Sequence, residues 1–183
     1  MKKIAVDKNQ TVGSHGTANA DQHKQLEKYG YAWEAVPLPF GDYCLVTDEF
    51  QQTVDRRGEK LKKMDLCGDV KSAIDVKASL DEVAMNVQGP EHDRFRDECI
   101  LAQKCGCKLT ILVCDESIRS VNDVWKWRSK RKGSKSNPIA LMKAMQTMSL
   151  RYSVRWLFCR HESIGRSIIY LLTGEDPDGH ETG

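Results

Sequence analysis

Two short motifs carry residue types that could perform chemistry on a phosphodiester. They are Gly41-Asp42-Tyr43 and Ile74-Asp75-Val76-Lys77, which together supply two carboxylates and one lysine. Residues i and i+2 of a strand point to the same face, so we expect Asp75 and Lys77 to project together. If the strand of the first motif pairs beside the second, Asp42 lies opposite Asp75.

This arrangement would suit a divalent metal ion. Two facing carboxylates can hold Mg²⁺, a hard cation that takes oxygen ligands and keeps several of its waters. A nearby ammonium, here that of Lys77, could orient or deprotonate one of those waters for attack on a phosphate. The pattern therefore predicts a minimal metal-dependent phosphodiesterase site.

Each motif also has an ordinary structural interpretation. Gly-Asp-Tyr can be a turn that enters a strand, with the aspartate bonded to nearby backbone. Asp75 and Lys77 can form a solvated charge pair that contributes little to stability. Arg94 and Glu98 are four residues apart and can form a helix-surface ion pair. The order of the motifs along the chain favours the catalytic interpretation.

The elements that must position these residues are strands first and then alternating helices and strands. Strands are expected at 4–6, 31–36, 42–47, 70–77, 109–114 and 154–159, and helices at 21–29, 80–87, 94–104, 138–150 and 162–172. Asn137 and Pro138 are typical of a helix start, as N-cap and first helical residue. Residues 9–20 are expected to form a loop, and residues 48–69 an exposed polar excursion such as a hairpin extension. This order predicts a three-layer α/β domain of the restriction-endonuclease type, with a central mixed β-sheet flanked by helices.

The composition indicates one globular domain with a modestly basic body. The chain has 183 residues, 40% of them apolar, and a formal net charge of +2. Residues 174–183 carry four acidic side chains and no lysine or arginine, so residues 1–173 alone carry +6. We expect a domain at 1–173, suited to a polyanionic partner, and a disordered acidic tail. No apolar run approaches the about 20 residues that span a bilayer, and the first residues lack the features of a signal peptide, which favours a cytoplasmic protein.

The seven cysteines are expected to be reduced thiols that hold no metal. Cys114 and Cys159 end apolar runs, where a reduced cysteine acts as a small hydrophobic residue. A disulfide scaffold is unusual in a cytosolic chain of this size. The alternative is a zinc site at Cys99, Cys105, Cys107 and Cys114, but the spacing lacks the paired C-x₂-C pattern that zinc sites favour.

A basic segment, residues 125–135, follows the fifth expected strand. It holds six positive charges in the ten residues from Lys126, next to Trp125 and Trp127. A charge run is usually a solvated loop, but interleaved tryptophans suit phosphate contact combined with stacking on bases or sugars. One tryptophan is expected to belong to the core. The expected DNA-contacting residues are Lys126, Arg128, Lys130, Arg131 and Lys132.

The order of the motifs resembles the nuclease domain of the XPF family, within the PD-(D/E)xK superfamily. That family carries V-D-x-R-E on its first strand, then G-D-Y, then (V/I)-E-R-K-S, and then a helix with an arginine and a Gln or Glu. The matching segments are Val6-Asp7-Lys8-Asn9-Gln10, Gly41-Asp42-Tyr43, Ile74-Asp75-Val76-Lys77-Ala78-Ser79 and Arg94-Phe95-Arg96-Asp97-Glu98. The resemblance spans most of residues 4–172, although few positions carry it.

The resemblance implies a Mg²⁺- or Mn²⁺-dependent endonuclease that hydrolyses phosphodiester bonds in DNA, including branched, flapped or recombination DNA. The implied catalytic residues are Asp42, Asp75, Lys77 and Arg94, the implied metal ligands are Asp42, Asp75 and the carbonyl of Val76, and the implied accessory residues are Asp7, Gln10 and Glu98. Lys77 would position the attacking water or stabilise charge on the phosphate, and Arg94 would face the scissile phosphate. The expected partners are DNA and a second copy of the chain, without a membrane.

Departures from the family pattern leave alternatives open. Asn9-Gln10 replaces Arg-Glu, so a third acidic ligand is missing, while Asp75 replaces Glu and Val76 replaces Arg. The sequence shows no helix-hairpin-helix pair and no helicase region, which favours a small stand-alone prokaryotic or phage-like member acting in its own or its host's cytoplasm. One alternative is a DNA-binding or scaffold protein that no longer cleaves, which Gln10 favours. Others are an RNA-cleaving enzyme and a restriction-type enzyme with sequence preference.

Overall fold

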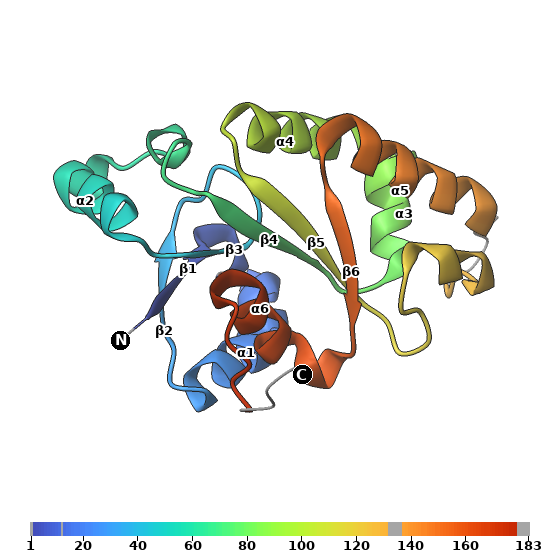
Figure 1. Cartoon of the computed structure of the whole chain (residues 1–183), viewed down its shortest axis with the longest axis horizontal. Coiled ribbons are helices and arrows are strands. Elements are labelled where there is room, and N and C mark those ends of the chain that lie inside the picture. The colour runs from blue at the N-terminus through green and yellow to red at the C-terminus, as the bar shows by residue number, and fades with distance from the viewer. Residues whose placement is uncertain (1, 12, 132–136, 179–183) are drawn as a thin grey trace.

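Six strands form one mixed sheet in the middle of the computed structural model, which describes residues 2–11, 13–131 and 137–178 (Figure 1). The strands are β1 (Lys3–Asp7), β2 (Ala32–Val36), β3 (Tyr43–Leu45), β4 (Ser72–Lys77), β5 (Lys108–Cys114) and β6 (Arg155–Cys159), in the spatial order β2-β1-β3-β4-β5-β6. Only β3 is antiparallel to its neighbours among these strands. The carboxyl ends of the other five therefore meet at one edge of the sheet, termed the carboxyl edge, and their starts lie at the amino edge.

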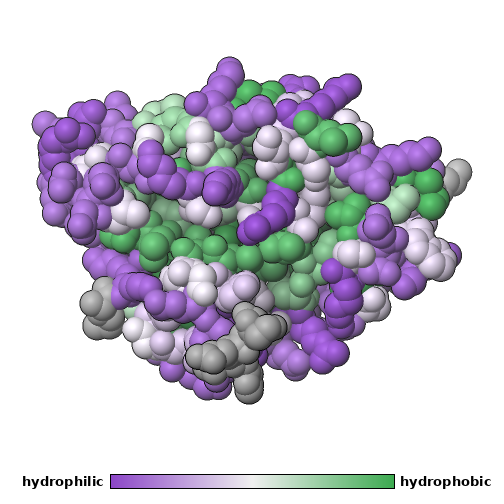
Figure 2. All heavy atoms as spheres, in the orientation of Figure 1, coloured by the Kyte–Doolittle hydropathy of each residue, from purple (hydrophilic) through white to green (hydrophobic). Residues whose placement is uncertain are grey.

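Helices cover both faces of the sheet and complete the predicted three layers. One face is covered by α2 (Asp48–Arg57), α3 (Leu80–Gln88), α4 (His92–Lys104) and α5 (Pro138–Tyr152), and the other by α1 (Gly13–Lys28) and α6 (Ile164–Thr173). Neighbouring residues of one strand serve different cores: Ala73 packs under the first group of helices and Ile74 under the second. Figure 2 shows the resulting band of hydrophobic residues across the middle of one face, between hydrophilic surfaces. Among the described helices, none is long and apolar enough to cross a membrane.

The polar segment 48–69 is not a hairpin extension, and this expectation is wrong. Residues 48–57 form α2, whose N-cap Thr47 accepts a hydrogen bond from the Phe50 N–H. Asp48 and Glu49 lie in the first turn and two arginines in the last, where they complement the helix dipole. Phe50 is fully buried and fixes the helix on the core. Only Phe50 and Val54 are apolar in this helix, so its composition favours an exposed segment, but its N-cap was a usable signal.

The first helix also begins earlier than expected. The loop predicted at residues 9–20 is replaced by a 3₁₀ turn at Lys8–Gln10 and by α1, which starts at Gly13. Glycines and asparagines are poor helix formers, so local propensity argued against a helix here. Tertiary packing outweighs that preference: Leu26 of α1 is fully buried in the core shared with α6.

The remaining helices and strands are confirmed, with changes at their ends. β3 is shorter than the predicted strand at 42–47. Helix α5 begins as predicted, because the Asn137 side chain accepts a hydrogen bond from the Ala140 N–H at 3.0 Å and Pro138 is the first helical residue.

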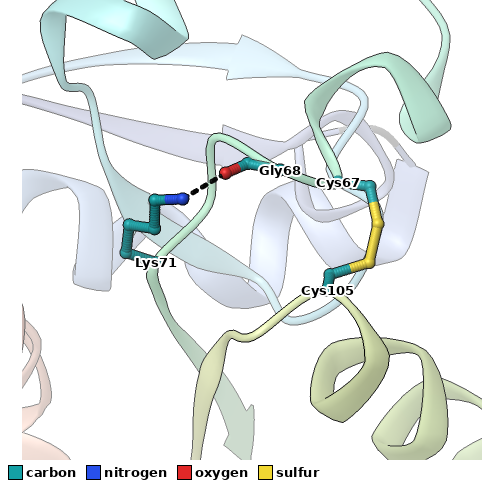
Figure 3. The surroundings of a disulfide bond; sticks show 4 residues. All are labelled: Cys67, Gly68, Lys71 and Cys105. Atoms are coloured by element: carbon teal, nitrogen blue, oxygen red, sulfur yellow. Dashed lines mark hydrogen bonds between the residues drawn. A yellow bond between two sulfur atoms is a disulfide. The ribbon is translucent and has the colours of Figure 1, made fainter.

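The expectation of fully reduced cysteines is wrong at two positions, because Cys67 and Cys105 form a disulfide bond (Figure 3). Each lies a few residues before a strand, β4 or β5, so the bond joins two turns at the amino edge. In the first turn, Lys71 Nζ donates to the carbonyl of Gly68 at 2.6 Å. The cysteines are 38 residues apart, and only the pairing of β4 with β5 brings them together. The other five cysteines are buried thiols.

The described part of the acidic tail, residues 174–178, contacts the body of the domain through ion pairs. Glu175 pairs with Lys2, and Arg166 pairs with Asp176 at 2.6 Å and with Asp178 at 2.8 Å. The disorder expected for the tail stays a prediction. It extends to residues 179–183, which lie outside the described residues.

Candidate active site

A polar cleft of about 710 Å³ lies where the catalytic motifs meet. Its lining includes every residue that the sequence suggested for catalysis, metal binding or an accessory role: Asp7, Gln10, Asp42, Asp75, Val76, Lys77, Arg94 and Glu98. Four separate segments of the chain supply these residues. The fold therefore brings together residues that lie far apart in the sequence.

Strand register explains why the charged residues share one side of the sheet. Ala73 of β4 packs under α2–α5, so Asp75 and Lys77 point toward those helices as well. Tyr43 pairs with Ile74 in the antiparallel ladder, which places Asp42 opposite Asp75. The backbone confirms this pairing, because the Asp42 N–H donates to the Ile74 carbonyl at 2.7 Å.

Gly41 is required by the close approach of its loop to β4. Its φ is +68°, and a Cβ atom there would lie 3.1 Å from both the Ala73 Cβ and the Ile74 carbonyl oxygen. Its N–H donates to Glu98 Oε1 at 2.8 Å, which ties the loop to α4. The glycine of the first motif thus allows the next residue, Asp42, to enter the cleft.

Asp42 is buried and held at both carboxylate oxygens. Gln10 Nε2 donates to Oδ1 at 2.6 Å, and the Val76 N–H donates to Oδ2 at 2.7 Å. Burial raises the pKa of Asp42 well above its usual range, and repulsion from Asp75 adds to this rise. The carboxyl is therefore fixed in place but is costly to ionise, and attraction to Lys77 offsets only part of that cost.

Asp75 and Lys77 form a buried ion pair, and their side chains are only 4% and 9% exposed. Lys77 Nζ lies 2.8 Å from Asp75 Oδ2 and 3.8 Å from Glu82 Oε1. Burial alone would lower the pKa of Lys77, but attraction to Asp75 and Asp42 outweighs it and raises the pKa. Lys77 is consequently an ammonium at neutral pH.

The two motif residues on α4 differ in burial: Glu98 lies inside the cleft and Arg94 at its rim. Glu98 is largely buried, and burial, followed by repulsion from Asp75, raises its pKa. Arg94 does not form the ion pair with Glu98 that the four-residue spacing suggested. Its Nε bonds instead to Glu91 at 2.9 Å, and the side chain is 65% exposed at the rim of the cleft.

Sequence reasoning missed several residues of the cleft. Lys63 Nζ lies 3.6 Å from Asp7 Oδ1, which also accepts the Leu38 N–H at 3.0 Å. Lys63 belongs to residues 48–69, which the sequence predicts to be an exposed polar segment. Asn19 lies in the part of α1 for which the sequence predicts a loop, whereas Gln22 lies in the helix predicted at 21–29. No motif marks either residue, and placing Asn19 also requires the correct secondary structure.

The donor set fits a hard divalent cation. The Asp42 and Asp75 side chains lie within hydrogen-bonding reach of each other, and a cation between them would relieve the repulsion that raises the pKa of Asp42. Among the described residues, no three His, Cys, Asp or Glu side chains are grouped to hold a metal, so the carboxylates form a partial ligand set. Mg²⁺ suits such a set because it keeps several waters. The ligand role of the Val76 carbonyl stays a prediction.

The described part of the basic segment, residues 125–131, lies at the same carboxyl edge but does not line the cleft. The carboxylate of Asp81, in the first turn of α3, accepts hydrogen bonds from the Ser129 hydroxyl and, at 3.1 Å, from the Lys130 N–H. The next residue, Glu82, contacts Lys77. The basic segment is thus attached to the helical turn that borders the catalytic lysine.

The two tryptophans of this segment differ as expected. Trp127 is 8% exposed and belongs to the core, whereas Trp125 is 52% exposed, with Lys126 Nζ 5.6 Å from its ring centroid. Lys126 also pairs with Asp123 at 2.8 Å, so its charge is partly offset. Lys132 lies outside the described residues. DNA contact by this segment stays a prediction.

The comparisons with known proteins agree on one family and fold. The family model of the ERCC4 domain matches residues 9–172. The structure of XPF from Aeropyrum pernix is similar with a TM-score of 0.56 and 16% identity, covering 93% of this chain and 63% of that one. XPF from Aeropyrum pernix in complex with DNA gives a TM-score of 0.59 and 16% identity, covering 94% of this chain and 64% of that one. The chain thus spans a little under two thirds of these proteins, and no curated protein matches its sequence.

Proposed function

This chain belongs to the ERCC4 domain family, and from that premise we propose that it is a Mg²⁺- or Mn²⁺-dependent endonuclease that hydrolyses phosphodiester bonds in branched or flapped DNA. The observation that carries the proposal is the convergence of Asp42, Asp75 and Lys77 in one buried cluster at the carboxyl edge. The similarity to an XPF structure in complex with DNA supports DNA as the substrate. The expected homodimer and cytoplasmic location belong to the same proposal.

Asp42 and Asp75 would hold the cation, with the Val76 carbonyl as a further oxygen ligand. A bound Mg²⁺ supplies Lewis-acid polarisation of the phosphate and lowers the pKa of water. The two aspartates are suited to this role because their side chains are buried and adjacent. The Gln10 amide and the Val76 N–H fix the orientation of Asp42, so little reorganisation is required when a ligand arrives.

Lys77 would orient the attacking water and stabilise charge on the phosphate. Its raised pKa keeps it protonated, so it donates hydrogen bonds and is a poor general base. Asp75 fixes the ammonium at 2.8 Å and limits its motion. The water oxygen bonds to phosphorus as the bond to the leaving oxygen breaks, while the attacking water gives a proton to solvent and the leaving oxygen takes one from it. Preorganised positive charge provides much of the rate enhancement.

Arg94 and Asp7 would act at the margins of the site. Arg94 is exposed at the rim, so its guanidinium can reach a phosphate without first losing a buried partner. Asp7 is buried beside Lys63 and holds the Leu38 backbone, and it would shape the site from β1. Glu98 anchors the Gly41 loop and would act as an accessory residue.

One observation favours a second function, DNA binding without cleavage. Gln10 stands where the family pattern has an acid, and its amide donates to Asp42 Oδ1, an oxygen that a metal would use. An amide does not supply the negative charge of that acid, so the metal would have one anionic ligand fewer. The proposal of catalysis requires that Asp42 can bind a metal beside Gln10.

The substrate panel tests the proposed function. The protein is incubated with end-labelled flapped, forked and linear DNA, with Mg²⁺, with Mn²⁺ or with EDTA, and the products are resolved by denaturing electrophoresis. We expect discrete cuts near the branch in the metal-containing samples and none with EDTA. Tight binding of the same DNA without cleavage in any metal supports the second function and contradicts the first.

A further inference from the structure

A continuous chain of hydrogen bonds leads from the core to the candidate metal ligand. The Tyr43 hydroxyl donates to Gln22 Oε1 at 2.8 Å, and Gln22 Nε2 donates to Asn19 Oδ1 at 3.1 Å. Asn19 Nδ2 donates to Gln10 Oε1 at 2.5 Å, and Gln10 Nε2 donates to Asp42 Oδ1 at 2.6 Å. Three amide side chains thus link a buried tyrosine to a buried carboxylate.

The direction of this chain is set at its Asp42 end. The Gln10 NH₂ faces Asp42, as a metal-binding carboxylate requires, because the ionised form can only accept hydrogen bonds. Gln10 Oε1 then faces Asn19, which must donate, and the same reasoning turns the Gln22 NH₂ toward Asn19. At the far end, Tyr43 is 1% exposed and donates its hydroxyl proton to the remaining Gln22 oxygen. Each amide therefore has one orientation that satisfies all its neighbours.

We propose that Asn19, Gln22 and Tyr43 are positioning residues that hold the Gln10 amide with its NH₂ toward Asp42 and so fix that carboxylate for metal binding. Gln10 thereby orients the metal ligand at the position where the family pattern has an acidic residue. The proposal rests on the proposed metal-dependent function, but the hydrogen-bond chain itself exists without a metal. In this proposal Tyr43 of the first motif orients the Gln22 amide in addition to packing in the core.

Metal affinity measured without DNA tests the proposal. Asn19→Leu removes the donor to Gln10 with little change in volume, and Tyr43→Phe removes only the hydroxyl at the far end. In Mn²⁺ titrations by calorimetry, Asn19→Leu should weaken binding about tenfold, as loss of a ligand's supporting hydrogen bond commonly does. Tyr43→Phe should have a smaller effect in the same direction. Asn9→Leu is the matched control, since Asn9 lines the same cleft outside this chain and should leave the affinity unchanged.

A double-mutant cycle shows whether Asn19 acts through Gln10. If it does, Asn19→Leu has no further effect in a Gln10→Leu background, because the link it supports is already lost. Full additivity of the two changes overturns the proposal. So does an Asn19→Leu variant with wild-type Mn²⁺ affinity.

The side-chain amide signals of Gln10 in ¹⁵N NMR spectra give a readout that needs neither metal nor activity. Asn19→Leu should shift these signals in the metal-free protein, and Asn9→Leu should not. A wild type that cleaves DNA but ignores Asn19→Leu in both measurements overturns the positioning proposal alone. A wild type that neither cleaves DNA nor binds Mn²⁺ overturns the proposed function and the metal-positioning role with it, and the Gln10 signals then decide whether the hydrogen-bond chain exists.

Discussion

The carboxyl and amino edges of the sheet belong to the same strands but differ in the kind of residues that they hold. At the carboxyl edge, β4 ends in a buried ion pair between Asp75 and Lys77, next to carboxyl groups whose pKa burial raises. At the amino edge, the turn before β4 is joined to the turn before β5 by the Cys67–Cys105 disulfide. One edge concentrates charge that is costly to bury, and the other is cross-linked covalently.

This difference indicates how the domain tolerates its site. Like charges that are buried close together oppose folding unless a counterion compensates them. The cross-link limits the freedom of the unfolded chain and so offsets part of such a cost. The comparison predicts that changes at the carboxyl edge alter chemistry more than stability, and that changes at the amino edge do the reverse.

The largest effect is expected for Lys77→Met. Cleavage of flapped DNA should fall about a thousandfold, because the ammonium that orients the nucleophile and stabilises the phosphate is lost. Mn²⁺ binding should persist, since Asp75 is freed from its ion pair. Single-turnover cleavage rates and calorimetric titrations measure the two quantities. Lys71→Met, an exposed lysine at the amino edge, is the matched control and should cleave like the wild type.

The amino edge provides the reciprocal test. Replacing Cys67 and Cys105 together by serine should lower the free energy of unfolding by about 2–4 kcal/mol, because the bond closes a loop of 38 residues. Denaturant titrations check the stability, and intact mass under non-reducing conditions checks the bond in the wild type. Cleavage at a temperature well below the melting point should be retained. A wild-type mass that shows seven free thiols contradicts the cross-link.

A smaller effect is expected for exposed charges, and it should differ between the edges. Changing Lys130 and Arg131 to alanine should weaken DNA binding for all sequences alike and flatten its salt dependence by nearly one unit of slope per lost phosphate contact. Changing Lys104 and Lys108, which lie at the amino edge, removes the same charge and should leave the slope intact. Titrations of log affinity against log salt separate these outcomes. Equal slopes for the two double variants would indicate that the basic segment faces solvent and does not contact DNA.

The smallest effect is a pH dependence of stability in the metal-free protein. The raised pKa values of Asp42 and Glu98 mean that the folded state keeps protons that the unfolded chain releases above about pH 4. The free energy of unfolding should therefore fall as pH rises from about 4 through these raised pKa values. Glu98→Gln should reduce this slope, whereas Glu59→Gln, at an exposed position, should not. Denaturant midpoints measured across this pH range give the dependence of stability on pH. A dependence that Glu98→Gln leaves unchanged contradicts the account.

The strands and the principal site residues were predictable because their signals are local. The β4 motif alternates between apolar and charged residues, so its period of two places Asp75 and Lys77 on one face. Its partner Asp42 could be placed opposite Asp75 because a glycine and a short apolar run mark the start of β3. The structure confirms this register.

What could not be predicted depends on contacts between distant segments. The polarity of α2 and the weak helix formers of α1 hide helices that packing stabilises. Asn19 therefore had no predicted face, and the hydrogen-bond chain that it continues from Gln22 to Gln10 and Asp42 could not be predicted. The disulfide depends on two turns that only strand pairing brings together. Arg94 lies near two acidic residues, and the sequence does not indicate that it pairs with Glu91 while Glu98 accepts the Gly41 N–H.

The most direct test of the central claim is the Asp75→Ala variant, assayed for cleavage, DNA affinity and melting temperature on the same preparation. Metal-dependent cleavage should fall by orders of magnitude, because one of two anionic metal ligands is lost. DNA affinity in EDTA should hold or rise slightly, since a carboxylate facing phosphates repels them. The melting temperature should hold, because repulsion on Asp42 and Glu98 is relieved while Lys77 keeps Asp42 and Glu82 nearby. An Asp75→Ala variant that cleaves like the wild type would place the active site elsewhere and contradict the account.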